Sequence, residues 1–223
     1  MTAAMPLGTV IVLAKQPLPG RAKTRLTPPL RPDQAARVAA GALTDTLAAA
    51  AGVAAGRHLL AFEGDPAEWL PAGWRYTGQP DGALDVRLVA AFAAADPRRP
   101  AVLVGMDTPQ CRPEHLTAFN PVRYDACLGP AVDGGYWAIG FRDPAAAAST
   151  IRGVPMSTGE TGSVQLARLR EAGLRVQLLD VLSDFDTFDA ACEILDQAPD
   201  GAFARAMRDV RVELAPARPG SRP

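Results

Sequence analysis

The stretch TVIVLAKQPLPGRAKTRL, residues 9–26, decides how this sequence folds. Its first part, Thr9–Ala14, is β-branched and apolar without alternation, which predicts a strand buried on both faces. Pro17, Pro19 and Gly20 then exclude a helix. Four cations lie within eleven residues just after the strand, at Lys15, Arg21, Lys23 and Arg25. This arrangement predicts an anion site at the end of the first strand, although a solvent-exposed basic loop would show the same residues.

Beyond this stretch, short apolar runs alternate with alanine-rich helical segments. Strands are predicted at 58–62, 74–77, 101–105, 126–128, 136–141 and 175–179, and helices at 33–51, 82–95, 113–119, 160–172 and 187–197. Such alternation predicts an α/β fold with a mainly parallel sheet between two layers of helices. We therefore expect one domain over residues 1–210. Residues 211–223 end in a segment rich in Pro, Gly and Arg, which predicts a disordered tail.

The composition limits the classes of partner. A net charge of −1 argues against broad attraction to nucleic acid or to a membrane surface, so we expect neither as a partner and any cationic site must be local. The three cysteines, Cys111, Cys127 and Cys192, form neither a disulfide framework nor a zinc pattern. This cysteine usage is typical of a reducing compartment, and we expect a cytoplasmic protein.

Four polar motifs directly follow predicted strands. They are KQPLPGRAKTR, MDTPQ, VDGG and SDFD, in chain order. In open α/β sheets, ligands bind where the loops at the carboxyl ends of the strands converge. We expect these motifs to meet in one site.

The basic loop has the chemistry of a phosphate site. Arginine forms bidentate contacts with phosphate oxygens and lysine supplies a mobile point charge. Gly20 would let the backbone approach the ligand closely. The loop is neither a Walker loop nor a dinucleotide fingerprint.

The acidic residues offer candidate metal ligands. Asp107 ends a predicted strand, and magnesium prefers few carboxylates together with substrate phosphate oxygens. Asp184 and Asp186 lie two apart on an extended segment and so point to the same side, where either could complete a metal site with Asp107. Turn formation at Asp107 and helix capping by the acidic cluster, with Asp189 in the first turn, are the structural alternatives.

The segment VDGGY supplies candidate acceptor-binding residues. Adjacent glycines permit a turn that a substrate could lie against, and the set is Asp133, Gly134, Gly135 and Tyr136. A plain hairpin turn accounts for the same letters.

Taken together, AKQPLPGRAKTRL, GMDTPQ, GPAVDGGYWAIG and SDFDT resemble the DUF2064 family in order and spacing over roughly residues 8–197. That family is also called the radical-SAM/selenodomain-associated transferase 1 group. It belongs to the GT-A nucleotide-diphospho-sugar transferase superfamily. The first motif also resembles the opening of 2-phospholactate guanylyltransferases.

The resemblance implies a GT-A (Rossmann-like) three-layer sandwich with a mainly parallel mixed sheet, and a transferase that uses Mg²⁺ or Mn²⁺. It implies metal binding by Asp107 and phosphate binding by Lys23 and Arg25. The segment GQPDGALDVR resembles a family stretch through Gln79, Gly82, Leu84 and Arg87, which adds Gln79 and Gly82 to the expected nucleotide contacts. It departs from that stretch at Ala83 and Asp85.

Two enzymatic mechanisms and one non-catalytic function fit these residues. The first is magnesium-dependent nucleotidyl transfer from an NTP to a small anionic acceptor with release of pyrophosphate, with Lys23, Arg25 and Asp107 as the catalytic residues. Because positioning and charge neutralisation dominate such catalysis, a loop rich in Lys and Arg suits it. The second is glycosyl transfer from a nucleotide-sugar, which calls for a carboxylate base such as Asp133. The third is a non-catalytic nucleotide-binding module. A homodimer is among the expected assemblies.

Overall fold

The computed structural model describes residues 6–198 and 200–215. Seven strands form one sheet in the order β3-β2-β1-β4-β6-β5-β7. Their bounds are β1 Leu7–Lys15, β2 Ala55–Glu63, β3 Arg75–Gly78, β4 Ala101–Gly105, β5 Ala126–Pro130, β6 Tyr136–Phe141 and β7 Val176–Leu178. β6 alone in this sheet runs antiparallel to its neighbours, so the sheet is mixed and mainly parallel, as the sequence predicts.

Strand β1 lies near the centre of the sheet because its side chains are apolar on both faces. Val10 and Val12 pack on one face and Ile11 on the other, and all three are fully buried. β1 pairs in parallel with β2 on one side and β4 on the other. The carboxyl ends of these three strands therefore lie together at one edge, where Lys15, Glu63 and Gly105 end them.

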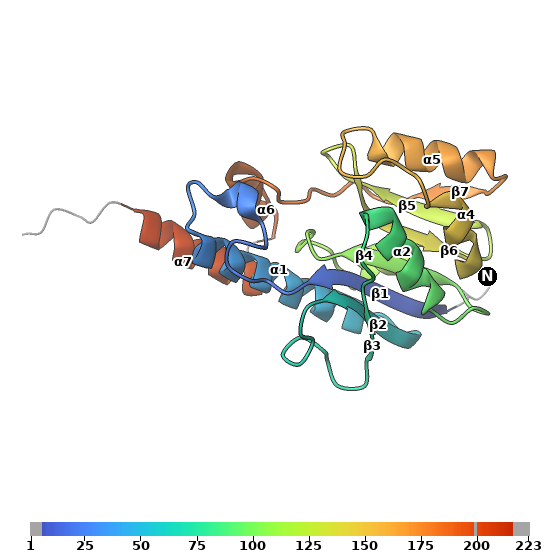
Figure 1. Ribbon diagram of the computed structural model, residues 1–223, viewed down its shortest axis with the longest axis horizontal. Coiled ribbons are helices and arrows are strands. Elements are labelled where there is room, and N and C mark those ends of the chain that lie inside the picture. Colours follow the sequence, from blue (N-terminus) through green and yellow to red (C-terminus); the bar gives the residue numbers. More distant parts are fainter. Residues whose placement is uncertain (1–5, 199, 216–223) are drawn as a thin grey trace, which may run out of the picture.

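Helices cover both faces of the sheet (Figure 1). They are α1 Pro32–Ala51, α2 Leu84–Ala93, α3 Pro113–Thr117, α4 Ala147–Thr150, α5 Thr161–Glu171, α6 Phe188–Gln197 and α7 Ala202–Leu214, with short 3-10 turns η1 Thr24–Leu26 and η2 Pro144–Ala146. The carboxyl half of α1 and α3 pack on one face. On the other face lie α2, α4 and α5, which completes the three layers.

A helical lobe extends beyond the sheet. The 20-residue α1 is long enough, at about 30 Å, to continue past the sheet edge. Its amino half packs against η1, α6 and α7 around a separate apolar cluster that includes Phe185, Phe203 and Met207, each fully or almost fully buried. Figure 1 shows α1, α6 and α7 together on one side of the molecule.

The expected tail boundary is wrong in part. Helix α7 runs to Leu214, so residues 211–214 are helical and the helix itself was absent from the sequence prediction. Phe203, Met207 and Val210 recur at helical spacing and bury one stripe of α7 in the lobe, which is why this segment is ordered. The remainder of the predicted tail, 216–223, lies outside the described residues.

The structure also describes the features relevant to membrane insertion and to disulfide formation. Among the described residues, no helix is both long and apolar enough to cross a bilayer. The three cysteines are free thiols, and burial raises the pKa of Cys127 far above its ordinary value and that of Cys111 to about 12.

Candidate functional site

The four polar motifs meet in one cleft at the carboxyl ends of β1, β2 and β4. The cleft has a volume of about 670 Å³. Each motif contributes lining residues, and the predicted site residues among them are Lys15, Arg21, Lys23, Arg25, Gln79, Asp107, Asp133, Gly135, Tyr136, Asp184 and Asp186. Loops that are distant in sequence thus meet at the carboxyl ends of the strands, where ligand sites of open α/β sheets lie.

Lys23 is the centre of the polar contacts in this cleft. Its Nζ lies 2.9 Å from Asp107 Oδ1 and 2.9 Å from Asp186 Oδ1, and only 8% of its side chain is exposed. The same Nζ stands 4.2 Å from the centroid of the Phe185 ring, a favourable cation–π contact. The Lys23 backbone is left-handed, at φ 50°, and this turn at the start of η1 directs the side chain inward.

The segment that carries Asp184 and Asp186 is held by the residue between them. Phe185 is fully buried in the lobe core, and its backbone N–H donates to the Asp107 carbonyl at 3.3 Å. The alternation of an extended segment then places both aspartates on the cleft side, as the spacing predicts. Asp186 also accepts from Arg25 at 2.8 Å, while the Arg25 side chain remains 71% exposed.

Neither acidic motif is used for helix capping. Helix α6 is capped by the Thr187 hydroxyl, which accepts from the Ala190 N–H, and Asp189 lies in the first turn. Helix α3 is preceded by Arg112, whose backbone N–H donates to the His115 ring. The carboxylates of Asp107 and Asp186 instead share the Lys23 ammonium. The backbone of Asp107 lies in a turn directly after β4, so the turn alternative holds for that residue alongside its ion pair.

The surroundings shift the pKa values of the central groups in opposite directions. Burial lowers the pKa of Lys23, but Asp107 and Asp186 outweigh it and the net pKa is raised. Burial raises the pKa of Asp186, yet Lys23 and Arg25 bring it below the ordinary value. Burial, Asp133 and Asp186 raise the pKa of Asp184 to about 6, against the lowering influence of Lys23.

The cleft is close to electrically neutral. Its cationic lining residues are Lys15, Arg21, Lys23, Arg25 and Arg87, and its anionic ones are Glu63, Asp107, Asp133, Asp184 and Asp186. Arg87 pairs with Glu63, and Lys23 and Arg25 pair with the aspartates. Lys23 and Arg25 therefore face carboxylates directly, whereas the exposed Lys15 and Arg21 have no ion pair among the described residues. The phosphate contacts expected of these four cations stay a prediction.

The VDGG motif forms the turn of a hairpin between β5 and β6. Gly134 N–H donates to the Ala131 carbonyl, and Gly135 N–H donates to Asp133 Oδ1 at 2.7 Å. Gly134 has φ +89°, and a Cβ there would lie 2.0 Å from the carbonyl oxygen of Gly159. The reason for this glycine is therefore contact with the chain itself, whereas Asp133, Gly135 and Tyr136 line the cleft.

Three predicted nucleotide contacts have other roles or positions. The Gln79 side-chain N–H group donates to the carbonyls of Ala14 and Ala61, at 2.7 and 3.0 Å, and so ties the ends of β1 and β2 together. Gly82 accepts from Arg87 Nε at 3.1 Å. Gly20, at φ +72°, has open space at its Cβ position, but neither Gly20 nor Gly82 is among the lining residues.

The sequence analysis missed one wall of the cleft, residues 156–159 with Thr161. Ser157 has a left-handed backbone at φ 60°, and the Thr158 N–H donates to Thr161 Oγ1 at 3.1 Å. Gly159 packs against Gly134, which joins this wall to the hairpin. The letters MSTG contain a glycine and two hydroxyl residues shortly before a helix, which is a turn signal, and the one charged residue nearby, Glu160, does not line the cleft.

The donor set fits a single divalent cation completed by a ligand. Asp107 and Asp186 already gather one oxygen each around a single cation, the Lys23 ammonium. Among the described residues, no group of three or more His, Cys, Asp or Glu is arranged to hold a metal. Two carboxylates could bind such a cation while phosphate oxygens and water fill its remaining coordination positions. Mg²⁺ prefers this mixed coordination to a site built from protein ligands alone.

The seven-stranded sheet with helices on both faces and a cleft at the carboxyl ends of its parallel strands defines a three-layer α/β fold. The family model for DUF2064, described as "Uncharacterized protein conserved in bacteria", matches residues 36–158. The chain belongs to this family. The matched range contains the Asp107 and Asp133 motifs, while the basic loop and the Asp184–Asp186 segment lie outside it.

Solved structures share the fold at low sequence identity. A "putative nucleotide-diphospho-sugar transferase" from Desulfovibrio desulfuricans G20 is 24% identical, with a TM-score of 0.80, covering 94% of this chain and 97% of that one. Rv0371c from Mycobacterium tuberculosis H37Rv, in complex with manganese, is 22% identical with a TM-score of 0.52, covering 86% and 100%. CMP:2-keto-3-deoxy-manno-octonic acid synthetase with CTP is 14% identical with a TM-score of 0.54, covering 85% and 98%. No curated protein matches the sequence.

Proposed function

We propose that this protein is a magnesium-dependent nucleotidyltransferase, which transfers a nucleotidyl group from an NTP to a small anionic acceptor and releases pyrophosphate. The observation that carries the proposal is the meeting of Lys23, Asp107 and Asp186 in one cleft at the carboxyl ends of the central strands. The structures of similar fold include a complex with CTP and a complex with manganese, which supports this choice of ligand and metal.

The cations of the first loop would bind the triphosphate. Lys15 and Arg21 line the cleft and are exposed, so they could contact phosphate oxygens without any rearrangement of the chain. Arg25 keeps most of its guanidinium exposed while it holds Asp186. Each of these groups stabilises negative charge that develops as the α-phosphate is attacked and pyrophosphate leaves.

The proposed metal ligands are Asp107 and Asp186, with Asp184 as the alternative to Asp186. Mg²⁺ held there would supply Lewis-acid stabilisation of phosphate charge. The charge balance of the cleft supports this requirement, because an NTP brings several negative charges into a lining whose own charges nearly cancel. The direct Lys23 contacts favour Asp186 over Asp184 as the partner of Asp107.

The acceptor is proposed to bind beside the turn of the β5–β6 hairpin. Asp133, Gly135 and Tyr136 line the cleft there, beside the hydroxyls of Ser157 and Thr158. These groups offer hydrogen bonds and can orient an acceptor toward the α-phosphate, which is the positioning that a transferase of this kind needs. Gly134 is left out of this set because it packs against Gly159.

A pyrophosphate-release assay tests the proposal. The four NTPs are incubated with Mg²⁺ and a panel of phosphorylated and carboxylated acceptors, and pyrophosphate is quantified. Lys23→Ala should lower turnover by about a hundredfold or more, because it removes the charge that organises both aspartates. Arg98→Ala is the matched control, since Arg98 is an exposed cation that precedes β4 at the opposite edge of the sheet. Unchanged turnover in Lys23→Ala would remove the loop from the mechanism.

Glycosyl transfer is the second candidate, favoured by one observation. Asp133 is an exposed carboxylate in the same cleft, where an acceptor hydroxyl could reach it. Thermal-shift screening separates the candidates. NTPs with Mg²⁺ should stabilise a nucleotidyltransferase, whereas stabilisation by nucleotide-sugars alone would support glycosyl transfer. Binding of NTP without turnover over the acceptor panel would support the non-catalytic module.

A further inference from the structure

Lys23 occupies the place that the proposed metal needs. Its ammonium bridges one oxygen of Asp107 and one of Asp186, at 2.9 Å each, and almost all of its side chain is buried. A divalent cation bound by both carboxylates would compete with the ammonium for these oxygens. Both positive ions could not share them, because like charges at such short range repel strongly in a partly desolvated site.

The lysine is held there by more than the carboxylates. The Phe185 ring lies beneath its Nζ, and the left-handed backbone at Lys23 fixes the inward direction of the side chain. A left-handed conformation is unfavourable for a non-glycine residue, so it persists only where the surroundings compensate it. The compensation here is two ion pairs and a cation–π contact made by a single ammonium.

We propose that Lys23 is a built-in cation between Asp107 and Asp186, and that a divalent cation binds these two carboxylates by displacing it. This inference rests on the proposed role of those two aspartates as metal ligands. It adds that metal entry and lysine release are one event. While it lies between them, the lysine prevents the two carboxylates from facing each other without a counter-ion.

The exchange changes the charge available to a substrate. Before the metal displaces Lys23, the Lys23 ammonium is ion-paired with two carboxylates. The cations available to phosphate are then Lys15, Arg21 and the exposed part of Arg25. After it, the carboxylates are neutralised by the metal and the ammonium is freed within the cleft. A phosphate chain then meets two additional positive charges from the metal, so metal and nucleotide should bind more tightly together than either does alone.

The sequence offers an internal reference for testing this. Lys15 and Lys23 are the only lysines in the chain, and both line the cleft. Lys15 is exposed, whereas the Lys23 side chain is only 8% exposed. An amine-reactive reagent therefore reports on the two residues separately, with Lys15 as the control for general effects of metal on the reagent and on the protein.

The first experiment measures acetylation rates of the two lysines in the intact protein by mass spectrometry, with and without Mn²⁺. Without metal, Lys23 should react more slowly than Lys15 because it is buried and ion-paired. Saturating Mn²⁺ should raise the Lys23 rate about fivefold or more and leave the Lys15 rate within about twofold, as expected for release from charge-assisted bonds. A Lys23 rate that Mn²⁺ leaves unchanged would overturn the exchange.

The second experiment measures Mn²⁺ affinity from the electron paramagnetic resonance signal of free Mn²⁺. Lys23→Met should bind about tenfold more tightly than the unaltered protein, which corresponds to about 1.4 kcal/mol. Lys15→Met removes the same charge from the same cleft and should change the affinity by no more than about twofold to threefold, as a screened long-range effect. Equal gains in both variants would contradict a specific competition.

The outcomes separate the exchange from the proposed function. Mn²⁺ that binds the unaltered protein and Lys23→Met equally well, and is lost in Asp186→Asn, overturns the exchange and leaves the metal ligands in place. Absence of Mn²⁺ binding in every variant overturns both the exchange and the metal ligands, while pyrophosphate release still tests nucleotidyl transfer. Should Lys23→Met fail to fold, the acetylation rates of the unaltered protein decide the matter alone.

Discussion

The sheet and the helical lobe are stabilised by different kinds of contact. In the sheet, residues of the central strands such as Ile11, Val12 and Val102 are buried to 0% exposure on apolar faces, and neighbouring strands pair along their length. In the lobe, the apolar stripe of α7 is supplemented by polar contacts at both ends of the helix. Asp45 accepts from the backbone N–H groups of Ala202 and Phe203, at 2.8 Å each.

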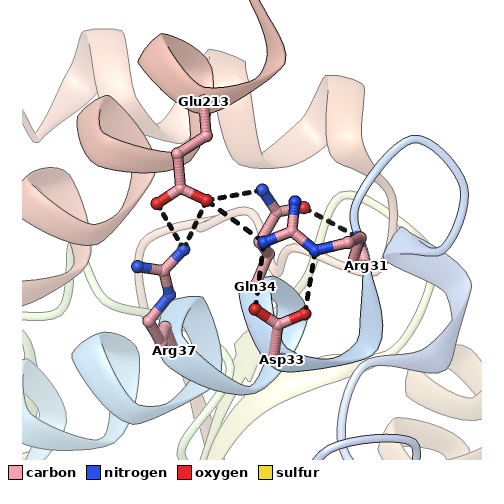
Figure 2. A network of polar contacts seen from close by, with 5 residues as sticks. All are labelled: Arg31, Asp33, Gln34, Arg37 and Glu213. Atoms are coloured by element: carbon pink, nitrogen blue, oxygen red, sulfur yellow. Dashed lines mark hydrogen bonds and ion pairs between the residues drawn. The ribbon is translucent and has the colours of Figure 1, made fainter.

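The far end of α7 is joined to the start of α1 by a network of charged side chains. Figure 2 shows Glu213 of α7 facing Arg31, Gln34 and Arg37 of the α1 region, with Asp33 beside Arg31. The Glu213 carboxylate accepts from Arg37 at 2.6 Å and from Gln34 at 2.7 Å. Arg37 and Gln34 lie 176 and 179 residues away from Glu213 in sequence, so the lobe depends on contacts that no local pattern contains.

This difference matters for the cleft because Phe185 belongs to the lobe core while Asp184 and Asp186 on either side of it line the site. Phe185 packs against Phe203 of α7 with ring centroids 5.0 Å apart. The lobe thus sets the position of the aspartates, and the sheet sets that of Asp107. Substitutions in the sheet and in the lobe should therefore show whether the two regions unfold together or separately.

The largest effect is expected in the sheet. Phe141 of β6 is fully buried and contacts Phe92 edge-on, with ring centroids 5.0 Å apart. Phe141→Ala should lower the free energy of unfolding by about 3–5 kcal/mol, through lost burial and a cavity. Urea denaturation followed by circular dichroism measures it. Val132→Ala, at a residue 70% exposed, should change the same quantity by less than about 0.5 kcal/mol.

Truncation in the lobe should act more locally. Phe203→Ala removes the partner of Phe185 from a fully enclosed core, and we expect a loss of about 3 kcal/mol in the stability of the lobe. Hydrogen exchange should speed up at the amides of α6 and α7 and remain unchanged at those of β1 and β4. Equal acceleration in both regions would show instead that sheet and lobe form one cooperative unit.

Removing the polar anchor of α7 should have a smaller effect. Asp45→Ala leaves the first N–H groups of α7 without their side-chain acceptor, which should cost about 1–2 kcal/mol. Thermal unfolding measures the change. Asp45→Asn keeps an acceptor oxygen and should recover most of the loss, whereas Asp209→Ala, an exposed carboxylate on the same helix, should have little effect. Equal losses in Asp45→Ala and Asp209→Ala would argue against the anchor.

The smallest effect is expected from Glu213, and it should depend on pH. Arg37, Gln34 and Arg31 lower the pKa of Glu213 to about 2. A carboxyl whose pKa is lowered by folding stabilises the folded state above its ordinary pKa of 4.5, and this contribution is lost as the pH falls toward 2. The melting temperature of Glu213→Gln should therefore lie slightly below that of the unaltered protein near neutral pH and converge with it in acid. A difference that is independent of pH would contradict the ion pairing.

Much of the fold could be predicted because buried strands and alanine-rich helices carry local signals. Residues 10–14 and 101–104 are apolar without interruption, and both segments lie in strands of the structure. Helix α7 was missed although Phe203, Met207 and Val210 have helical spacing, because the charged residues between them conceal a narrow apolar stripe. The wall at residues 156–159 was missed because its polar groups carry no charge.

The sequence predicted which residues line the candidate site better than it predicted which of them contact each other. The motifs around Lys23, Asp107, Asp133 and Asp186 line one cleft because parallel strands end at the same edge. The sequence analysis assigned Lys23 to phosphate binding and Asp107 and Asp186 to metal binding. Instead, Lys23 contacts both aspartates directly, 163 residues from Asp186 in the chain. Gly134 and Gln79 were assigned to ligands. In the structure Gly134 packs against the Gly159 backbone, while Gln79 lines the cleft and donates to two backbone carbonyls.

The sequence by itself determined the layered α/β architecture and which residue types stand at the ends of the strands. Both follow from hydrophobic periodicity and backbone preferences, which act over a few residues. The tertiary structure alone decided that the Lys23 ammonium lies between two carboxylates and that a helix from the C-terminal region supports one of them. Such contacts depend on distances between segments far apart in the chain, which only the packed core fixes.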